Sequence, residues 1–208
     1  MCIKKILNKI LNTLNIYPDI NQRYTLMSMF ISGLLVTYAS PAITKAIISE
    51  LPAEWLAFEA LFGSTCALII GMIWKGKTRE YSTKFFMTLA LIESIVGCLL
   101  SMYLCFIEYN VWVFAIISLV YSSFVSIFVG KCIMVFKSIL YNEKGREIYD
   151  NNASIIGGIV SVIGYSLALL FMPSLKLSLF LWGLCCIIDD LGWIIVYNRN
   201  KELLKSKI

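Results

Sequence analysis

The stretch KCIMVFKSILYNEKGREIYDNNASIIGGIVSVIGYSLALLF, residues 131–171, determines how the rest of the chain can be arranged. It joins the end of one apolar run to the next apolar run through a polar, basic segment at residues 141–152, which we expect to be a loop. Lys and Arg in such loops are retained on the cytoplasmic side of a membrane. The stretch therefore indicates that the protein lies in a membrane, and it indicates which side of the protein faces the cytoplasm.

Six apolar runs can be marked along the chain, at residues 25–47, 53–74, 85–107, 111–136, 154–172 and 177–197. Each is close to the roughly 20 residues that a helix needs to cross a hydrocarbon core of about 30 Å. Hydrophobic residues make up 59% of the chain and charged residues only 15%, against about 25% charged in soluble domains. We therefore expect an all-α integral membrane protein with six transmembrane helices in one domain.

The two ends of the chain are polar and basic. Residues 1–19 place isoleucines and leucines at helical spacing with lysines opposite, which predicts an amphipathic helix lying on the cytoplasmic membrane surface. The alternative is a frayed or disordered leader. Residues 198–208 form a basic tail, which we also place in the cytoplasm.

The distribution of basic residues predicts the topology. All of the 18 Lys and Arg residues except Lys45, Lys131 and Lys176 fall in the amino-terminal segment, in the connections after the second and fourth runs and the residues flanking them, or in the tail. Positive loops stay inside, so both termini should be cytoplasmic. The net charge of +5 then reflects membrane topology, and we expect no nucleic-acid partner.

Histidine is absent from the sequence, and this excludes several kinds of active site. Ser–His and Cys–His nucleophile pairs, His-ligated zinc and the HExxH helix all require it. The seven cysteines lie mostly inside the apolar runs, where they behave as small hydrophobic residues. A divalent cation held by carboxylates alone would have to draw on acids from different runs. We expect no enzyme, no cofactor and no metal site.

Ionisable residues within the runs are the candidates for chemistry. Counting about 1.5 Å per residue puts Glu93 about 13 Å from the cytoplasmic edge and Asp189 about 18 Å from the outer edge, both near the bilayer centre. A charge there costs at least about 2.5 to 3.5 kcal/mol. Asp189 and its neighbour Asp190 point about 100° apart on a helix. Glu59 lies about 9 Å from the outer face, and Lys131 lies at a similar depth from the inner face.

We interpret Glu93, Asp189, Asp190 and Glu59 as protonatable or cation-pairing groups for transport, with Lys131 as their charge partner. The alternative for the acids is that each is protonated and hydrogen-bonded to a neighbouring helix. The alternative for Lys131 is that its long side chain reaches the membrane surface.

Proline and glycine in the runs predict how the helices pack. Pro41 should kink or break the helix of the first run, because proline cannot donate the next hydrogen bond. Gly157 and Gly164 are seven residues apart in the fifth run and share one helix face, on which a neighbouring helix can approach closely.

Two segments carry a family resemblance. The first resembles the junction of helices four and five in the major facilitator superfamily. It consists of the basic end of the fourth run, Lys-Gly-Arg-Glu at residues 144–147, and the uncharged ASIIGGIVSVIG at residues 153–164. GMIWKGKTR, residues 71–79, occupies the place of that family's cytoplasmic loop between helices two and three. The resemblance implies one six-helix half of such a transporter, built from three-helix repeats, with helices one and four lining a cavity and a homodimer or partner half completing the pore.

We therefore expect a half-size transporter in the bacterial cell membrane that moves a small solute or exports a drug-like compound, with proton coupling through the buried acids. One alternative is a non-transporting binding or immunity-type membrane protein, favoured because Lys75 stands at or near the family's loop acid. Another is the substrate-binding subunit of a vitamin importer, which would dock its partner through the small residues Ala42 and Ala46.

Overall fold

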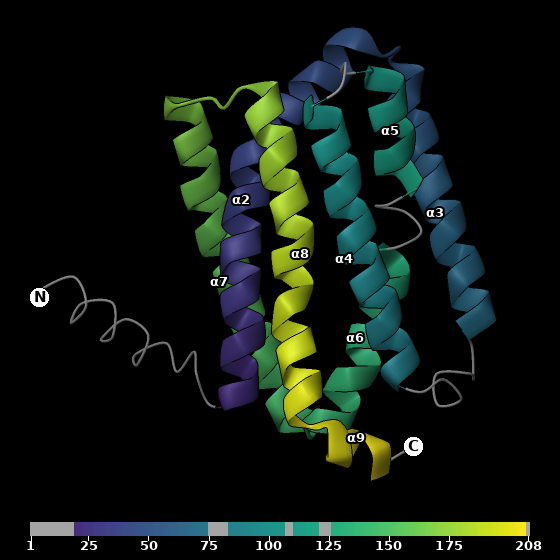
Figure 1. The fold of residues 1–208 in the computed structure, drawn as a ribbon, viewed down its shortest axis with the longest axis vertical. Coiled ribbons are helices and arrows are strands. Elements are labelled where there is room, and N and C mark those ends of the chain that lie inside the picture. Colours follow the sequence, from purple (N-terminus) through teal and green to yellow (C-terminus); the bar gives the residue numbers. More distant parts are fainter. Residues whose placement is uncertain (1–18, 75–82, 107–109, 121–125, 207–208) are drawn as a thin grey trace, which may run out of the picture.

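The computed structural model describes residues 19–74, 83–106, 110–120 and 126–206 (Figure 1). These residues form helices joined by short connections, and none of them is in a strand. The helices are α2 (Ile20–Glu50), α3 (Glu54–Trp74), α4 (Thr83–Phe106), α5 (Val111–Val120), α6 (Ser126–Leu140), α7 (Glu143–Leu170), α8 (Leu175–Arg199) and α9 (Lys201–Ser206). Within the described part of the chain, α2, α3, α7 and α8 are long and apolar enough to cross a membrane. The protein is an all-helical, membrane-embedded chain.

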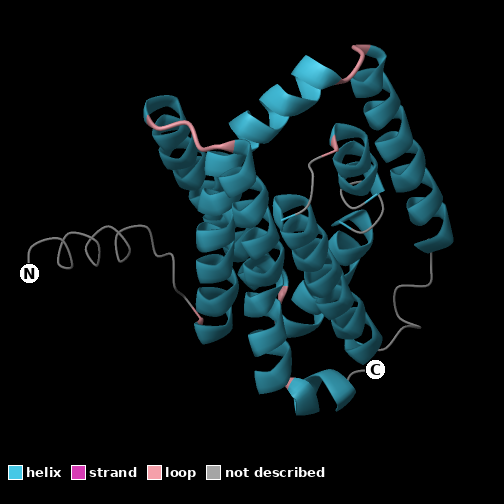
Figure 2. Ribbon diagram, turned by 45° about the horizontal axis from the view of Figure 1, so that its top comes forward, coloured by secondary structure: helices cyan, strands magenta, loops and turns pink. Residues whose placement is uncertain are grey.

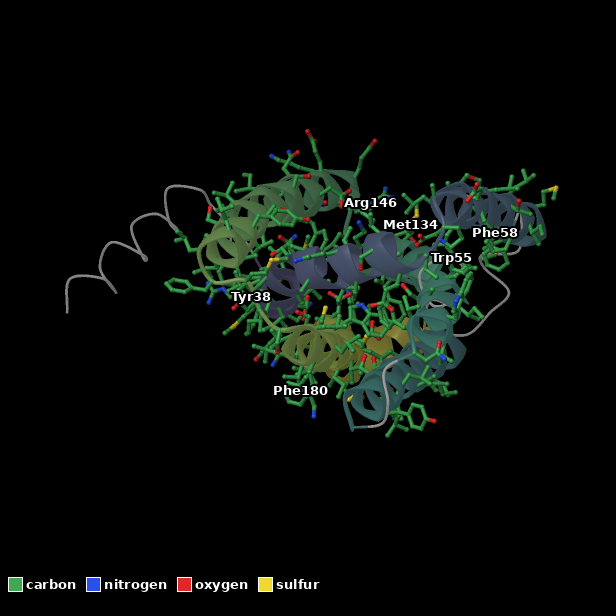
Figure 3. The ribbon with its side chains drawn as sticks, turned by 90° about the horizontal axis from the view of Figure 1, so that it is seen from above. Tyr38, Trp55, Phe58, Met134, Arg146 and Phe180 are labelled. Carbon is green, nitrogen blue, oxygen red and sulfur yellow. The ribbon has the colours of Figure 1, made fainter. Side chains whose placement is uncertain are left out.

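Helix α8 lies at the centre of the bundle, between α2 and α4 (Figure 1). Helix α7 packs on the other side of α2, so that from above α2 lies between α7 and α8 (Figure 3). A buried apolar cluster, which includes Leu26, Tyr149 and Trp193, joins α2, α6, α7 and α8. Helix α3 lies at the edge of the bundle and exposes large apolar side chains: Leu56, Phe58, Leu61, Leu68, Ile69 and Met72.

Two glycines allow α8 to approach both neighbours closely. A Cβ atom added to Gly192 would lie 2.7 Å from the Tyr24 backbone oxygen and 2.8 Å from Thr25 Cα, both on α2. A Cβ atom added to Gly183 would lie 2.7 Å from Ser101 Cβ on α4. Small residues at such contacts bring helix backbones together, which is a main source of packing energy between helices in a membrane.

The glycine face expected on the fifth run is present where α7 meets α2. A Cβ atom on Gly164 would lie 2.8 Å from Thr37 Cβ and 3.1 Å from the Tyr38 backbone nitrogen. The Thr37 hydroxyl also donates a hydrogen bond to the Val160 carbonyl oxygen at 3.1 Å. Gly158, by contrast, faces open space. The packing contact is therefore concentrated at one glycine of this helix.

Helix α2 is longer than the first apolar run and includes Pro41. It begins after Asp19, whose carboxylate accepts a hydrogen bond from the Asn21 backbone N–H at 3.1 Å and caps the helix. Pro41 does not break the helix. Figure 2 shows the final turns of α2 leaving the bundle at an angle and running toward α3, as the missing N–H of a proline allows.

The polar segment at residues 141–152 is not a loop, and this expectation was wrong. Only Tyr141 and Asn142 connect α6 to α7, and α7 begins at Glu143. The Asn142 side-chain oxygen accepts a hydrogen bond from the Gly145 backbone N–H at 2.8 Å, which caps the helix. The first turns of α7 are amphipathic, with Tyr149 buried in the core, so a polar composition is compatible with a helix here.

The start of α2 and the end of α8 lie at the same end of the bundle. The Asn200 side-chain amide donates a hydrogen bond to the Asn21 side-chain oxygen at 3.2 Å, and the Arg199 guanidinium lies 5.5 Å from the centroid of the Tyr24 ring. The amphipathic helix expected for the amino terminus falls at residues 1–18, outside the described residues. The fourth run contains α5 and α6, and residues 121–125 between them are also outside the described part.

Candidate functional site

Two adjacent carboxylates on α8 face two different helices. The Ser32 hydroxyl on α2 donates a hydrogen bond to Asp189 Oδ1 at 2.9 Å. The Ser94 hydroxyl on α4 lies 2.5 Å from Asp190 Oδ2 and donates to it. Neighbouring helix positions point about 100° apart, so a helix placed between two others can offer one acid to each.

The two acids differ in exposure. Asp190 is 5% exposed and Ser94 is 3% exposed, so their hydrogen bond is enclosed between α4 and α8. Asp189 is exposed, although its partner Ser32 is buried. The Ser28 hydroxyl, one turn before Ser32, also lies 3.4 Å from the Asp189 backbone oxygen. Serines one turn apart on α2 thus hold this part of α8.

The partners of these acids are neutral hydroxyls. Among the described residues, the hydrogen bonds to the two carboxylates come from Ser32 and Ser94 and not from Lys or Arg. A serine hydroxyl can donate to a carboxylate and can also accept a proton from a carboxylic acid. With these described partners, either acid can change its protonation state and keep a hydrogen bond.

Two further candidates from the sequence have side chains outside the described part of the structure. Glu93 belongs to α4, and Lys131 belongs to α6. Their proposed roles in proton coupling and charge pairing stay predictions.

Glu59 is remote from the α8 acids along the chain and lines a separate cavity. The cavity has a volume of about 320 Å³ and lies between α2, α3, α5 and α8. Its described lining is mostly apolar, with hydroxyls from Ser40, Thr44 and Ser118 and one carboxylate, that of Glu59. The apolar lining residues are Val36, Ile43, Ile47, Ile48, Leu56, Phe114 and Trp182.

Aromatic side chains form one wall of this cavity. Phe114 is 1% exposed, and its ring meets the Trp182 ring edge to face, with 6.1 Å between the ring centroids. Trp55 and Phe58 lie together on the neighbouring part of α3 (Figure 3), with their ring centroids 5.6 Å apart. Because Phe114 is held by packing on all sides, this wall is fixed before any ligand arrives.

The small residues Ala42 and Ala46, which we expected to dock a partner subunit, are 8% and 9% exposed. They face the protein's own bundle, so this pair is not available to a partner. The expectation failed because a short pattern of small residues has the same appearance on an inner and on an outer helix face.

Sequence reasoning did not identify the serine partners of the α8 acids. A signal was present at the start of the first run and just before it, where Gln22, Thr25, Ser28 and Ser32 recur at helical spacing and are all buried. A polar stripe within an apolar run indicates a face turned toward protein. A similar stripe marks Ser94, because Gly97, Cys98 and Ser101 follow it at helical spacing and are also buried.

No group of three or more Cys, Asp or Glu side chains among the described residues lies close enough together to hold a metal ion. Comparisons with protein-family models, with curated proteins and with solved structures found no match for this chain. The chemistry of the site must therefore be argued from the side chains themselves.

Proposed function

We propose that the protein is a half-size transporter similar to one half of a major facilitator, coupled to protons through the α8 acids. The observation that carries this proposal is that Asp190 is enclosed between α4 and α8, and that Asp190 and the exposed Asp189 each accept a hydrogen bond from a serine of a different helix. Intramembrane acids are costly and mark ion or proton pathways more often than surface acids do.

The helix contacts are compatible with a pair of three-helix repeats, although the α4–α6 and α3–α6 contacts are much smaller than the α2–α8 and α2–α7 contacts to which they would correspond. In such a pair of repeats, α2 corresponds to the fourth-run helices α5 and α6, α3 corresponds to α7, and α4 corresponds to α8. The counterpart of the α2–α8 contact is then α4–α6, and the counterpart of the α2–α7 contact is α3–α6. The α4–α8 contact maps onto itself. Repeats of this kind let one bundle rock about a central site in alternating access.

In this proposal the protonation state of the acids shifts the balance between two arrangements. A neutral Asp190 fits the enclosed contact between α4 and α8, because burial disfavours the charged form. A charged Asp190 favours an arrangement in which water reaches it. Coupling follows if the solute binds better to one arrangement than to the other.

We place the end that carries α9 in the cytoplasm of a bacterial cell. Basic side chains gather there: Arg23, Lys137, Lys144, Arg146, Arg199 and Lys201. We also propose a homodimer, because six helices supply only one half of a pore of this kind. The exposed apolar face of α3 would meet either a second copy or lipid, and the mass in nanodiscs distinguishes these outcomes.

Proton flux in proteoliposomes tests the transport proposal. Vesicles that enclose a pH-sensitive dye would be challenged in turn with ethidium, chloramphenicol and taurocholate, a cation, a neutral compound and an anion. We expect at least one of them to cause protein-dependent proton movement, and we expect Asp190→Asn to reduce it at least tenfold. Asp150→Asn, which removes an exposed acid of α7, is the matched control. Equal flux in the wild type and in Asp190→Asn would contradict the proposal.

A non-transporting binding protein is the second candidate. It is favoured by the fact that serine hydroxyls already satisfy both acids, as a purely structural role requires. In that case Asp190→Asn changes stability alone, and none of the three compounds moves protons.

A further inference from the structure

The geometry points to a binding site for a small aromatic organic cation in the cavity between α2, α3, α5 and α8, with Glu59 as its counter-charge. This inference rests on the proposed function, for which it names the substrate class. The α8 acids supply the proton site in that function, and the cavity is a separate place for the solute.

The size of the cavity suits a small organic molecule. Its volume of about 320 Å³ lies at the lower end of the range of about 300 to 1,000 Å³ for ligand pockets in proteins. One aromatic ring with a short charged substituent fits this space. Larger lipids and peptides would have to extend beyond it.

The wall favours an aromatic cation over an aliphatic one. Trp182 and Phe114 meet edge to face, and both line the cavity. The face of a tryptophan ring attracts a cation, and the attraction is stronger when water is excluded. A ligand ring can also pack on Trp182, which adds apolar contact, while the enclosed Phe114 supports the Trp182 ring from behind.

The charge of the cavity is set by Glu59. Glu59 is the single acid among the described lining residues, which include no Lys or Arg. Within the described part of the chain, no side chain donates a hydrogen bond or forms an ion pair with its carboxylate, whereas Asp189, Asp190 and Asp150 all have partners. A carboxylate at membrane depth without a partner is stabilised by a cation that enters the cavity.

Ser40 can complete the contact with the ligand. Its hydroxyl donates to the Val36 backbone oxygen at 2.6 Å, so its own oxygen is left as an acceptor facing the cavity. Acceptors and a carboxylate suit an ammonium group and do not suit an anion.

The test is a binding measurement on the full chain in nanodiscs, which does not depend on transport. Benzyltrimethylammonium would be titrated calorimetrically alongside neopentylbenzene, its uncharged analogue of the same shape, and phenylmethanesulfonate, an anion of similar size. We expect the cation to bind at least tenfold more tightly than either of the other two.

Variants then identify the counter-charge. Glu59→Gln should weaken binding of the cation at least tenfold, while Glu59→Asp, which keeps the charge, should weaken it by less than threefold. Glu54→Gln, an exposed acid of the same helix outside the cavity lining, is the matched control and should change the Kd by less than twofold. If Glu59→Gln does not fold, the comparison of the cation with neopentylbenzene in the wild type still decides whether the cavity selects for positive charge.

Three results would overturn the inference. They are equal binding of the cation and neopentylbenzene, unchanged binding in Glu59→Gln, and a co-purified lipid that the cation does not displace. The outcome is independent of the transport test, because Asp190→Asn should abolish proton flux and leave the binding of benzyltrimethylammonium intact. Binding without flux in the wild type would retain the site and reject the transporter.

Discussion

The Ser94 hydroxyl of α4 and the Asp190 carboxylate of α8 lie 2.5 Å apart in the interior of the bundle, although 96 positions separate them in the chain. The hydrogen bond joins the two helices at a point where both side chains are almost fully enclosed. This link fixes the position of α8 relative to α4.

Removing this hydroxyl should destabilise the bundle. We expect Ser94→Ala to lower the free energy of unfolding by about 1 to 2 kcal/mol, because a buried carboxyl group loses a donor. Unfolding in mixed micelles with increasing sodium dodecyl sulfate, followed by circular dichroism, measures the change. Ser138→Ala is the control, since that exposed hydroxyl bonds only within α6, to the Val135 carbonyl at 2.7 Å. An equal loss in both variants would argue against the link.

Glycine contacts on α7 give a second prediction. Gly164→Ala should destabilise the protein by about 1 to 3 kcal/mol, because the new methyl group would overlap Thr37 of α2. Gly158→Ala on the same helix should be neutral or stabilising by up to about 1 kcal/mol, since it meets open space and alanine favours helix. The same unfolding assay compares them, and a larger effect at Gly158 would refute the packing described here.

The ion pair between Lys137 and Asp150 should contribute little. Their charged atoms are 2.6 Å apart, but the Asp150 side chain is 59% exposed. Exposed pairs contribute about 0 to 1 kcal/mol and are screened by salt. We expect Asp150→Asn to cost less than about 1 kcal/mol, and the difference from the wild type to shrink as sodium chloride is raised. A larger cost that does not change with salt would indicate that the surrounding protein shields the ion pair from water and ions.

Tyr141 gives a prediction about pH. It lies between α6 and α7, and its buried hydroxyl has no hydrogen-bond partner among the residues that the structure describes. Burial raises the pKa of Tyr141 above its ordinary value of 10.0, and the neighbouring Asp19 and Tyr149 raise it further. The unfolded chain therefore releases this proton first, and stability is lost as the pH rises above 10.

Tyr141→Phe should remove that part of the alkaline loss. Near neutral pH we expect the variant to be as stable as the wild type or up to about 1 kcal/mol more stable, because no hydrogen bond is lost and an unsatisfied buried group is removed. Melting temperatures of both proteins between about pH 8 and pH 11 measure the difference. An equal alkaline loss in both proteins would show that Tyr141 does not titrate in this way.

The sequence predicts the positions of the helices well where apolar runs are continuous. Each run contains a helix or, in the fourth run, two helices. The sequence predicts the helix ends less well, because they depend on local capping. Asp19 caps α2, which begins five residues before the first run, and Asn142 caps α7, which begins eleven residues before the fifth run. Hydropathy does not register an amphipathic turn that continues a membrane helix.

The candidate site was predicted in part. Residue counting along a helix identified Asp189, Asp190 and Glu59, because depth depends only on position in the run. Their surroundings depend on which helices become neighbours. Ser32 and Ser94 come from runs one and three, and Trp182 joins Phe114 across α8 and α5. A single sequence carries no information about such distant pairs.

The central place of α8 has a consequence for biosynthesis. The ribosome makes α8 after α2, α4 and α7, yet α8 fills the space between α2 and α4. Until it is inserted, the buried serines of both helices have no carboxylate partners, and two close-packed faces stay open to lipid or to the insertion machinery. Assembly of the bundle must therefore wait for one late helix, and a nascent chain stalled before residue 175 should be a target for membrane quality control.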